Sequence, residues 1–486
     1  MSLDLVSSAA AAHPGDLALD DGERAWTYAD FHARVQAAAE RLRALGVQGL
    51  PVALVSESTG DAVMAVHAVL AAGGVLAPLS PRLTADELRP ALAALRPRLV
   101  LAAPDAWDRA LDAGVRPVPL AALEDAHGDA LARRAAPSGW PELPPRTRVV
   151  LWTSGTGGRP RGIAITDENL HASIGGAVAR IGLARDDRWL ATLGLGHVGG
   201  LLILLRAAAT GARVIARGRF RPDEANALLD SAGVTHASLV PTMLRQLMDL
   251  RADRAPASVR CLLIGGAHCP RALVERAIAA GWPLALTYGM TEATSQAATA
   301  PPALVRTKPG TVGAPLDGIE LRVDEAGEIF LRGPTVAASY LGTELTLQDE
   351  EGWLRTGDLG EIDGDGHLWI TGRRSDRIVT GGVNVDPVEV EDILRLHDGV
   401  SDAAVVGLPD DRWGEVVAAA VVALKGAYPD PAELEDLTRA RLTTAKVPRR
   451  WLFLAELPRN ANGKVDRDAV RQGFGPRPLD RGPGSG

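Results

Sequence analysis

The chain has 486 residues, of which 46% are hydrophobic and 23% charged. A chain of this length and hydrophobicity can bury a large core, and its length predicts two or more domains. The net charge of -8 gives no electrostatic reason to expect binding to nucleic acid or to an anionic membrane. No apolar run approaches the roughly 18 residues that a membrane-spanning helix needs.

Cysteine usage and the N-terminus bear on the cellular location. The two cysteines, Cys261 and Cys269, have a spacing that fits no common zinc pattern, and so few thiols are typical of a reducing compartment. The first residues, MSLDLVSSAAAAHP, lack the basic region of a secretory signal. We therefore expect a cytoplasmic protein.

The first 145 residues alternate helical and strand patterns. Residues 27–47 form an amphipathic pattern that ends at a glycine, 51–58 read as a strand, and 62–80 as a helix, a glycine turn and a strand. This alternation predicts βαβ units and a mostly parallel, doubly wound sheet.

A loop with little side-chain bulk follows next, between a strand at 149–152 and a short strand at 163–165. Backbone N–H groups of such a loop can converge on an anion, and its hydroxyls add further donors. Arg161 brings positive charge, so a polyphosphate is the expected occupant, although a plain hairpin loop remains an alternative. The lysine of a kinase-type P-loop is absent after the glycines. The loop residues are Thr153, Ser154, Gly155, Thr156, Gly157 and Gly158.

Further strands and helices follow the loop. Thr166 or Asp167 can cap a helix, and strands are predicted at 235–241 and 259–267, followed by a strand and polar loop over 284–296. The second of these strands ends in Gly265 and Gly266, at the carboxyl end where parallel strands present ligand sites. Residues 310–372 change to short strands with glycine turns, which predicts a small antiparallel barrel or sheet.

The charged, glycine-bounded segment 372–382 marks a domain boundary. We expect an N-terminal domain at 1–374, a C-terminal domain at 375–474 and a disordered tail at 475–486. Within the C-terminal domain, the pattern predicts helices at 387–396 and 431–442 and strands at 402–406 and 416–424.

Three more stretches offer nucleotide chemistry. In TYGMTE, the ring of Tyr288 can face a base, Thr291 can reach a phosphate and Glu292 offers oxygen to Mg²⁺. Asp358, between glycines in GWLRTGDLG, can accept both ribose hydroxyls. Lys464 lies just after a tight turn in NANGKVDR, where a compact charge suits a crowded site. Each stretch alone has an ordinary alternative: a buried aromatic, a surface carboxylate, a turn aspartate or an exposed lysine.

Together and in this order, the motifs TSGT, YGMTE, TGD, GRxxD and NGK resemble the adenylate-forming superfamily of acyl-CoA synthetases, luciferases and peptide-synthetase adenylation domains. The resemblance covers about residues 10–470. It implies an α/β fold with a large N-terminal domain of α/β subdomains plus a small barrel-like part, and a small, mobile α+β C-terminal domain. It also implies ATP, CoA and Mg²⁺ as cofactors.

The resemblance assigns a role to each matching position. A carboxylate attacks the α-phosphorus of ATP, and Lys464 stabilises the growing charge, with Thr291 and Glu292 as further catalytic residues and Glu292 as the Mg²⁺ ligand. The glycine-rich loop and Arg161 hold phosphates; Gly265, Gly266, Tyr288 and Gly289 flank the adenine; Asp358 and Arg373 hold the ribose. Ser375 is the hinge, and Gly381 and Gly382 form the loop of the CoA stage.

The chain departs from the family pattern at three of these positions. Gly158 stands for a threonine, Arg161 for a lysine and Ser375 for a frequent aspartate. The first two keep backbone donors and positive charge, so we expect altered affinity with retained activity. A serine can still serve as the hinge.

Within the superfamily, residues 196–214, 237–247 and 286–296 resemble the o-succinylbenzoate-CoA ligases of menaquinone biosynthesis. Such a substrate has a second carboxylate, for which Arg206 is the candidate partner, unless it is a helix arginine extending to solvent. His197 is expected at the acyl pocket, and Thr294 and Ser295 can bond the substrate. Another aryl- or fatty-acid ligase, a freestanding loader of carrier proteins and an inactive nucleotide-binding relative remain alternatives.

Overall fold

The structure is a computed structural model and describes residues 3–124, 140–153, 161–251, 254–341, 346–460 and 464–475. The chain divides into two compact units. The first takes the described residues up to Trp369 except Pro270–Ala272 and Gly357–Glu361, which belong with the residues from Ile370 onward in the second. Residues 476–486 of the predicted tail lie outside the described residues.

One of the sheets in the first unit has six strands and is parallel except for one edge hairpin. Its strands, in spatial order, are β6 (Val118–Pro119), β5 (Leu99–Ala102), β3 (Pro51–Val55), β4 (Val75–Leu79), β7 (Thr147–Thr153) and β8 (Arg161–Thr166). The helical elements before β7 are α1 (Val6–Ala12), α2 (Tyr28–Ala44), α3 (Gly60–Ala71), α4 (Ala85–Leu95), η1 (Pro104–Ala106), α5 (Trp107–Asp112) and η2 (Leu120–Leu123). The predicted parallel arrangement is confirmed, and only β7 and β8 pair antiparallel among these strands.

An eight-stranded sheet forms the second layer of this unit. Its order is β14 (Ser295–Ala300), β13 (Leu284–Met290), β12 (Cys261–Ile264), β11 (His236–Leu239), β9 (Arg188–Ala191), β10 (Arg213–Ala216), β1 (Leu17–Asp20) and β2 (Ala25–Thr27). Its helical elements are α7 (Asp167–Ile181), α8 (Val198–Thr210), α9 (Pro222–Ser231), α10 (Pro241–Asp249), α11 (Arg271–Ala279), η3 (Thr291–Ala293) and α12 (Pro302–Thr307). The strands from β9 to β13 run parallel, so their carboxyl ends share one edge.

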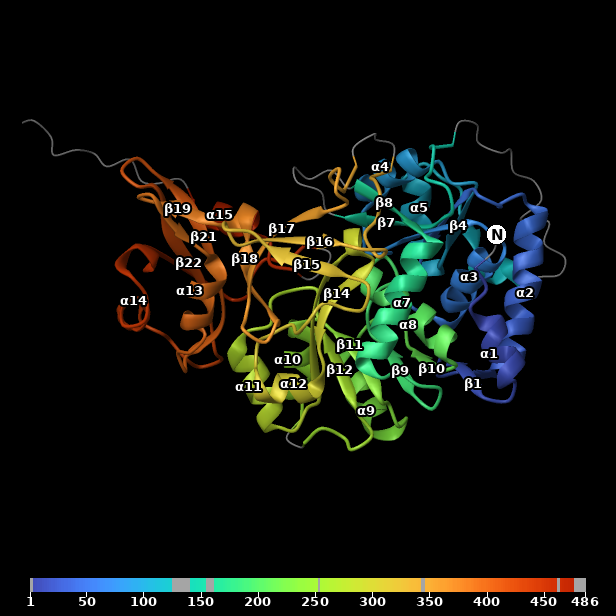
Figure 1. Ribbon diagram of the computed structural model, residues 1–486, viewed down its shortest axis with the longest axis horizontal. Coiled ribbons are helices and arrows are strands. Elements are labelled where there is room, and N and C mark those ends of the chain that lie inside the picture. Colours follow the sequence, from blue (N-terminus) through green and yellow to red (C-terminus); the bar gives the residue numbers. More distant parts are fainter. Residues whose placement is uncertain are drawn as a thin grey trace, which may run out of the picture. The chain divides into compact units, whose positions relative to one another are not determined.

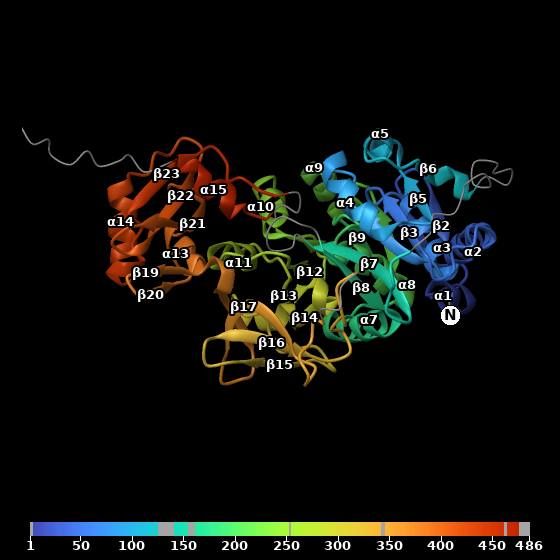
Figure 2. The same cartoon turned by 90° about the horizontal axis from the view of Figure 1, so that it is seen from above.

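One hydrophobic cluster joins the two sheets. It contains Leu54 and Leu76 from the first sheet, Trp189 and Val214 from the second, and the apolar helix residues between them. Helices α2 and α3 lie side by side (Figures 1 and 2), as do α7 and α8. Helix α8 is buried along almost its entire length, which explains why its sequence is apolar apart from Arg206 and the terminal Thr210.

Short strands form a third sheet, as the glycine-rich pattern predicts. Its order is β15 (Glu320–Val323), β16 (Glu328–Arg332), β17 (Leu354–Ile362) and β18 (Leu368–Arg373). Strands β15 and β16 form an antiparallel hairpin (Figure 2).

The second unit is a sheet with helices on both faces. The sheet order is β20 (Val383–Val385), β19 (Ile378–Thr380), β22 (Gly414–Ala423) and β21 (Val400–Asp410), and β23 (Arg450–Leu454) pairs parallel with β22. The helical elements are η4 (Arg374–Asp376), α13 (Pro387–Leu394), α14 (Pro431–Arg439), η5 (Thr444–Lys446) and α15 (Arg467–Gly473). Side chains of α13 and α14 pack in one core cluster and Val470 of α15 in another, which places α15 on the opposite face.

None of the described helices is long and apolar enough to cross a membrane. This agrees with the absence of long apolar runs in the sequence.

His67 makes the stability of the first unit depend on pH. Its ring is buried on α3 and meets Phe31 edge-on, with 5.7 Å between ring centroids. Burial lowers its pKa to about 4, although Asp4 acts in the opposite direction. Because the folded pKa lies below the ordinary value near 6.5, the stabilisation is complete above about pH 6.5 and is lost as the pH falls toward 4.

We therefore expect the His67→Leu variant to lose less stability in acid than the wild type. Between pH 7.5 and 5.0, the wild-type free energy of unfolding should fall by about 2 kcal/mol more than that of the variant, at 1.36 kcal/mol per pH unit. Urea unfolding at the two pH values measures this difference. Identical pH dependence in both proteins would show that His67 is not held neutral.

Candidate functional site

The two strands that flank the glycine-rich segment pair antiparallel. Thr153, the last residue of β7, pairs with Arg161, the first residue of β8. The guanidinium carbon of Arg161 lies 5.2 Å from the centre of the Tyr340 ring. The two predicted flanking strands are therefore confirmed, while the predicted loop residues from Ser154 to Gly158 lie outside the described residues.

The turn after β13 carries Thr291 and Glu292 and has an uncommon backbone. Thr294 and Ser295 have φ values of 50° and 92°, the left-handed region that non-glycine residues rarely adopt. Side-chain and backbone hydrogen bonds fix this turn from outside. Ser173 Oγ on α7 donates to the Thr294 carbonyl at 2.5 Å, and Thr294 Oγ1 donates to the Thr335 carbonyl at 2.7 Å.

Glu292 lies half-buried on this turn, and the Ala337 N–H donates to its carbonyl oxygen at 2.8 Å. A carboxylate on such a fixed backbone is a hard oxygen donor that fits Mg²⁺. The alternative of a surface carboxylate is not favoured by this half-buried position.

Three further predicted residues lie at the same sheet edge. Gly265 and Gly266 follow β12, and Gly289 lies near the carboxyl end of β13, the next parallel strand. A Cβ on Gly265 would come within 2.6 Å of Thr287 Cγ2, and Gly266 has a φ of +77°. Glycine is therefore required for close packing at the first position and for backbone conformation at the second. The side chain of Tyr288, the residue before Gly289, is buried.

His197 precedes α8 on the segment that leaves the carboxyl end of β9. Its ring is half-buried, and a Cβ on Gly194 would lie 3.9 Å from His197 Cδ2 and 4.0 Å from a Glu57 carboxylate oxygen. The topology therefore brings His197 to the edge that also carries the glycines of β12 and β13.

Arg206 is buried in α8 with 1% of its surface exposed, so the alternative that it extends to solvent is wrong. Its Nη2 lies 3.4 Å from Ser173 Oγ, which in turn bonds the Thr294 carbonyl. Burial lowers its pKa to about 9, and its Nε has no hydrogen-bond partner among the described residues. Two predicted substrate residues, Arg206 and Thr294, thus meet through Ser173.

Sequence reasoning missed Ser173, Thr335 and Gln296. The amide atoms of buried Gln296 have no partner among the described residues, and Gln296 pairs with Gly289 in the sheet register. A serine inside a helix was the available hint for Ser173, because such hydroxyls often bond backbone carbonyls. Nothing in the spacing pointed to the other two residues.

The predicted ribose pair is brought together in the second unit. Arg373 Nε lies 3.3 Å from Asp358 Oδ1, across neighbouring strands β18 and β17. The Asp358 side chain is 18% exposed and that of Arg373 is 52% exposed. The carboxylate is therefore held in place yet accessible.

Backbone and side-chain hydrogen bonds join Lys464 to Asn460. The Asn460 N–H donates to the Lys464 carbonyl at 2.9 Å, and Asn460 Oδ1 accepts from the Lys464 N–H at 3.1 Å. Arg459 and Val465 form an antiparallel bridge just outside this pair. The lysine is exposed, and residues 461–463 of the predicted turn lie outside the described residues. The paired residues 459–460 and 464–465 are called the Lys464 hairpin.

The predicted hinge residue and the predicted loop of the CoA stage both lie among the described residues. Ser375 lies in the short turn η4 and its hydroxyl donates to Asp376 Oδ1 at 3.2 Å. Gly381 and Gly382 join β19 to β20 with φ values of 56° and 81°, as a tight two-residue hairpin requires. A Cβ on Gly381 would lie 2.6 Å from Trp413 Cε3.

Asp363, Asp365 and His367 form another group of potential metal ligands, but a lysine already lies among them. Lys308 Nζ donates to Asp363 Oδ2 at 2.9 Å and also to Asp365. The Lys308 ammonium holds the pKa of Asp363 well below its usual range. The turn is therefore a salt-bridge cluster, and we assign no metal to it.

Comparison with known proteins identifies relatives across both units. Residues 6–341 match the AMP-binding enzyme family, and residues 389–464 match the C-terminal domain of that family. The chain is 34% identical over 472 residues to a 2-succinylbenzoate–CoA ligase of Bacillus cereus, which covers 94% of this chain and 96% of that protein.

Solved structures show the same pattern. The o-succinylbenzoate CoA synthetase (MenE) of Bacillus subtilis in complex with the acyl-adenylate OSB-AMP is 31% identical, with a TM-score of 0.85 over 96% of this chain and 98% of that one. The same enzyme is known with ATP and magnesium ion. ATP-bound MatB from Rhodopseudomonas palustris is 29% identical, with a TM-score of 0.86 over 97% and 98%.

The turn geometry predicts that Gly289→Ala destabilises the first unit. The added Cβ would lie 1.7 Å from the Ser295 carbonyl oxygen, so the β13–β14 pairing must shift. We expect a loss of about 3 kcal/mol or more in the free energy of unfolding. Gly175→Ala on the exposed side of α7 is the matched control, because nothing lies within 4 Å of its Cβ. Urea unfolding with equal midpoints for the two variants would contradict this account.

Proposed function

The chain belongs to the AMP-binding enzyme family, and from this we propose that it converts 2-succinylbenzoate, ATP and CoA into 2-succinylbenzoyl-CoA, AMP and pyrophosphate. The observation that carries the proposal is the likeness to a 2-succinylbenzoate–CoA ligase over 94% of the chain. The enzyme is an AMP-forming acid–thiol ligase. Its reaction is the menaquinone-pathway step that the sequence resemblance implies, and we place it in the cytoplasm.

The reaction has two half-reactions. A carboxylate oxygen of the acid attacks the α-phosphorus of ATP, the bond to the β-phosphate oxygen breaks, and pyrophosphate leaves. The CoA thiol, after losing its proton, then attacks the acyl carbon, and AMP leaves with the oxygen that joined it to the acyl group. Each step separates anions or brings them together. The main catalytic requirement is therefore positive charge that the enzyme positions beside the reacting groups.

Under this proposal each group of residues has one task. Lys464 stabilises the charge that develops between the carboxylate and the α-phosphate. Asp358 accepts the ribose hydroxyls beside Arg373, and the glycine-rich loop with Arg161 holds the phosphates. Gly265, Gly266, Tyr288 and Gly289 flank the adenine. Glu292, with Thr291 beside it, holds Mg²⁺, which when bound neutralises phosphate charge.

The two half-reactions also need a rearrangement of the expected C-terminal domain, residues 375–474. Ser375 serves as its pivot, and Gly381 and Gly382 replace Lys464 at the acyl-adenylate for the thiol attack. The boundaries expected from the sequence, 1–374 and 375–474, are the corresponding catalytic domains. Separate chain units that carry Glu292 and Lys464 support this division.

The test of substrate identity is pyrophosphate release with ATP and Mg²⁺ across 2-succinylbenzoate, benzoate and fatty acids. We expect rapid release with 2-succinylbenzoate and formation of its thioester once CoA is added. If another acid gives the highest kcat/KM, the enzyme is a different member of the family, and the proposed substrate is wrong. A thioester on a carrier protein rather than on CoA would identify a carrier-loading enzyme.

The buried cation predicts how the second carboxylate is recognised. Arg206 is a desolvated charge with an unpartnered Nε, and an anion beside it would offset part of the cost of burial. His197, Thr294 and Ser295 complete the proposed acyl site. Arg206→Met should raise KM for 2-succinylbenzoate at least about tenfold, or about 1.4 kcal/mol, and leave benzoate turnover unchanged. Arg206→Lys, which keeps the charge, should restore part of the affinity. Equal losses with both acids would exclude this role.

Lys464→Ala should reduce adenylation by about several hundredfold, as expected for the loss of one placed charge, and largely spare thioester formation from supplied acyl-adenylate. Single-turnover assays of the two half-reactions measure this. Lys425→Ala, an exposed lysine in the same unit, is the matched control and should behave like the wild type. Equal losses in both half-reactions would count against the rearrangement.

A further inference from the structure

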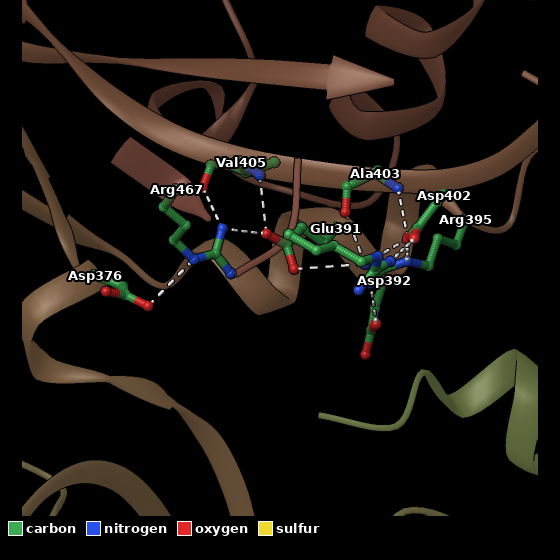
Figure 3. A network of polar contacts seen from close by, with 9 residues as sticks. Asp376, Glu391, Asp392, Arg395, Asp402, Ala403, Val405 and Arg467 are labelled. Atoms are coloured by element: carbon green, nitrogen blue, oxygen red, sulfur yellow. Dashed lines mark hydrogen bonds and ion pairs between the residues drawn. The ribbon is translucent and has the colours of Figure 1, made fainter. Parts of the chain in front are cut away.

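Charged side chains cover the free edge of β21, the last strand of its sheet (Figure 3). The Val405 N–H donates to Glu391 Oε1 at 2.9 Å, and the Val405 carbonyl accepts from Arg467 Nη1 at 2.6 Å. The same Nη1 donates to Glu391 Oε1 at 2.5 Å. A carboxylate and a guanidinium thus take the place of a neighbouring strand.

The pattern repeats two residues earlier on the same strand. The Ala403 carbonyl accepts from Arg395 Nη2 at 2.7 Å, and the Ala403 N–H donates to Asp402 Oδ1 at 2.9 Å. Arg395 Nη2 lies 3.6 Å from Glu391 Oε2, which joins the two parts into one network. Open strand edges invite pairing with other chains, so this cover also protects the edge.

The network reaches both sides of the Lys464 hairpin. Arg459, at its start, donates through Nη2 to Asp402 Oδ2 at 2.8 Å. Arg467 follows Lys464 by three residues and donates through Nε to Asp376 Oδ2 at 3.2 Å. Asp376 is the neighbour of Ser375. One arginine therefore connects the hairpin of the lysine to the residue beside the proposed pivot, within a single unit of the chain.

Energetics favour a rigid connection. Burial alone would raise the pKa of Glu391, but the guanidinium groups of Arg467 and Arg395 outweigh burial and hold that pKa below its ordinary value. Burial would lower the pKa of Arg467, yet Glu391 and Asp376 hold it above the usual range. Glu391, Arg395 and Arg467 therefore all remain charged at neutral pH. Charges buried in this way resist rearrangement, because separation leaves each of them unpaired.

We propose that Arg467 is a positioning residue for adenylation, which fixes the Lys464 hairpin to Glu391 and Asp376 so that the lysine and the pivot move as one body. The inference rests on the catalytic role proposed for Lys464. Its physical basis is that displacement of a charged group by about 1 Å can cost on the order of a hundredfold in rate.

The mildest test breaks only the connection to Asp376. Asp376→Asn leaves the Arg467–Glu391 pair intact, and we expect adenylation kcat to fall about fivefold with KM for ATP unchanged. Asp392→Asn is the matched control, since it belongs to the same network and has similar side-chain exposure, 29% against 32%, but contacts Arg395 instead. We expect this control to stay within about twofold of the wild type.

A stronger test removes the buried pair together, because Arg467→Met alone would leave the buried Glu391 with only Arg395, 3.6 Å away, as its charged partner and would destabilise the unit. Arg467→Met combined with Glu391→Gln should lower adenylation about a hundredfold and leave thioester formation from supplied acyl-adenylate within about threefold. Equal losses in both half-reactions would overturn the proposal, because they would mean a general structural role.

A double-mutant cycle separates this inference from the function on which it rests. In a Lys464→Ala background, Asp376→Asn should cause no further loss of adenylation, because the connection acts only through the lysine. Additive losses would overturn the positioning role. If Lys464→Ala itself left adenylation intact, the catalytic role proposed for the lysine would be wrong. If Lys464→Ala greatly reduced adenylation but Asp376→Asn alone did not change it, only the positioning role of Arg467 would be refuted.

Discussion

The left-handed turn between β13 and β14 is the constraint on which the first unit's site depends. Thr294 and Ser295 adopt positive φ values without being glycines, at a cost of order 1–3 kcal/mol each. The turn persists because Ser173 and Thr335, from distant parts of the chain, bond its carbonyl and hydroxyl groups. The strain is thus offset by hydrogen bonds that also set the backbone beneath Glu292. A flexible loop of the same composition would leave that carboxylate without a defined direction.

Parallel strands explain how remote residues share one edge of the sheet. Gly265 after β12 and Gly289 within β13 let the backbone approach closely, and the segment after β9 brings His197 to the same side. The arrangement leaves Arg206 behind this edge, where a buried cation is costly unless an anion or a polar group compensates it. In the second unit, charged side chains bond the backbone at the free edge of β21, where a neighbouring strand would otherwise pair. In both units, polar side chains therefore form hydrogen bonds with backbone groups that have no partner in a neighbouring strand.

Local chemistry made part of this predictable from the sequence. Thr166 caps α7 as expected, because its hydroxyl accepts from the Asn169 N–H. Two glycines at 381–382 predict a tight hairpin, and the apolar run of α8 predicts burial. The expected strands at 402–406 and 416–424 are longer in the structure and form one extended hairpin, β21 and β22. Their alanines and valines gave the strand type correctly, but the chain pattern does not mark where the ladder ends.

Long-range polar contacts could not be predicted in the same way. The partners of Arg467 are 62 to 91 positions away in the chain, and helical periodicity says nothing about which strand edge an arginine reaches. Similarly, the position of Arg206 among leucines indicated an unusual cation, but only packing of α7 against α8 shows that Ser173 lies beside it. The sequence motifs fixed the residue types needed for nucleotide chemistry, whereas the groups that hold those residues in place depend on the fold.

The most direct test of the central claim follows oxygen from the acid into the nucleotide. The enzyme is supplied with 2-succinylbenzoate labelled with ¹⁸O in its carboxylates, together with ATP, Mg²⁺ and CoA. The mass of the nucleotide product is then measured by mass spectrometry. Attack of the carboxylate on the α-phosphorus predicts AMP that carries one labelled oxygen, alongside the CoA thioester. Unlabelled AMP, or ADP and phosphate in its place, would contradict an acyl-adenylate route.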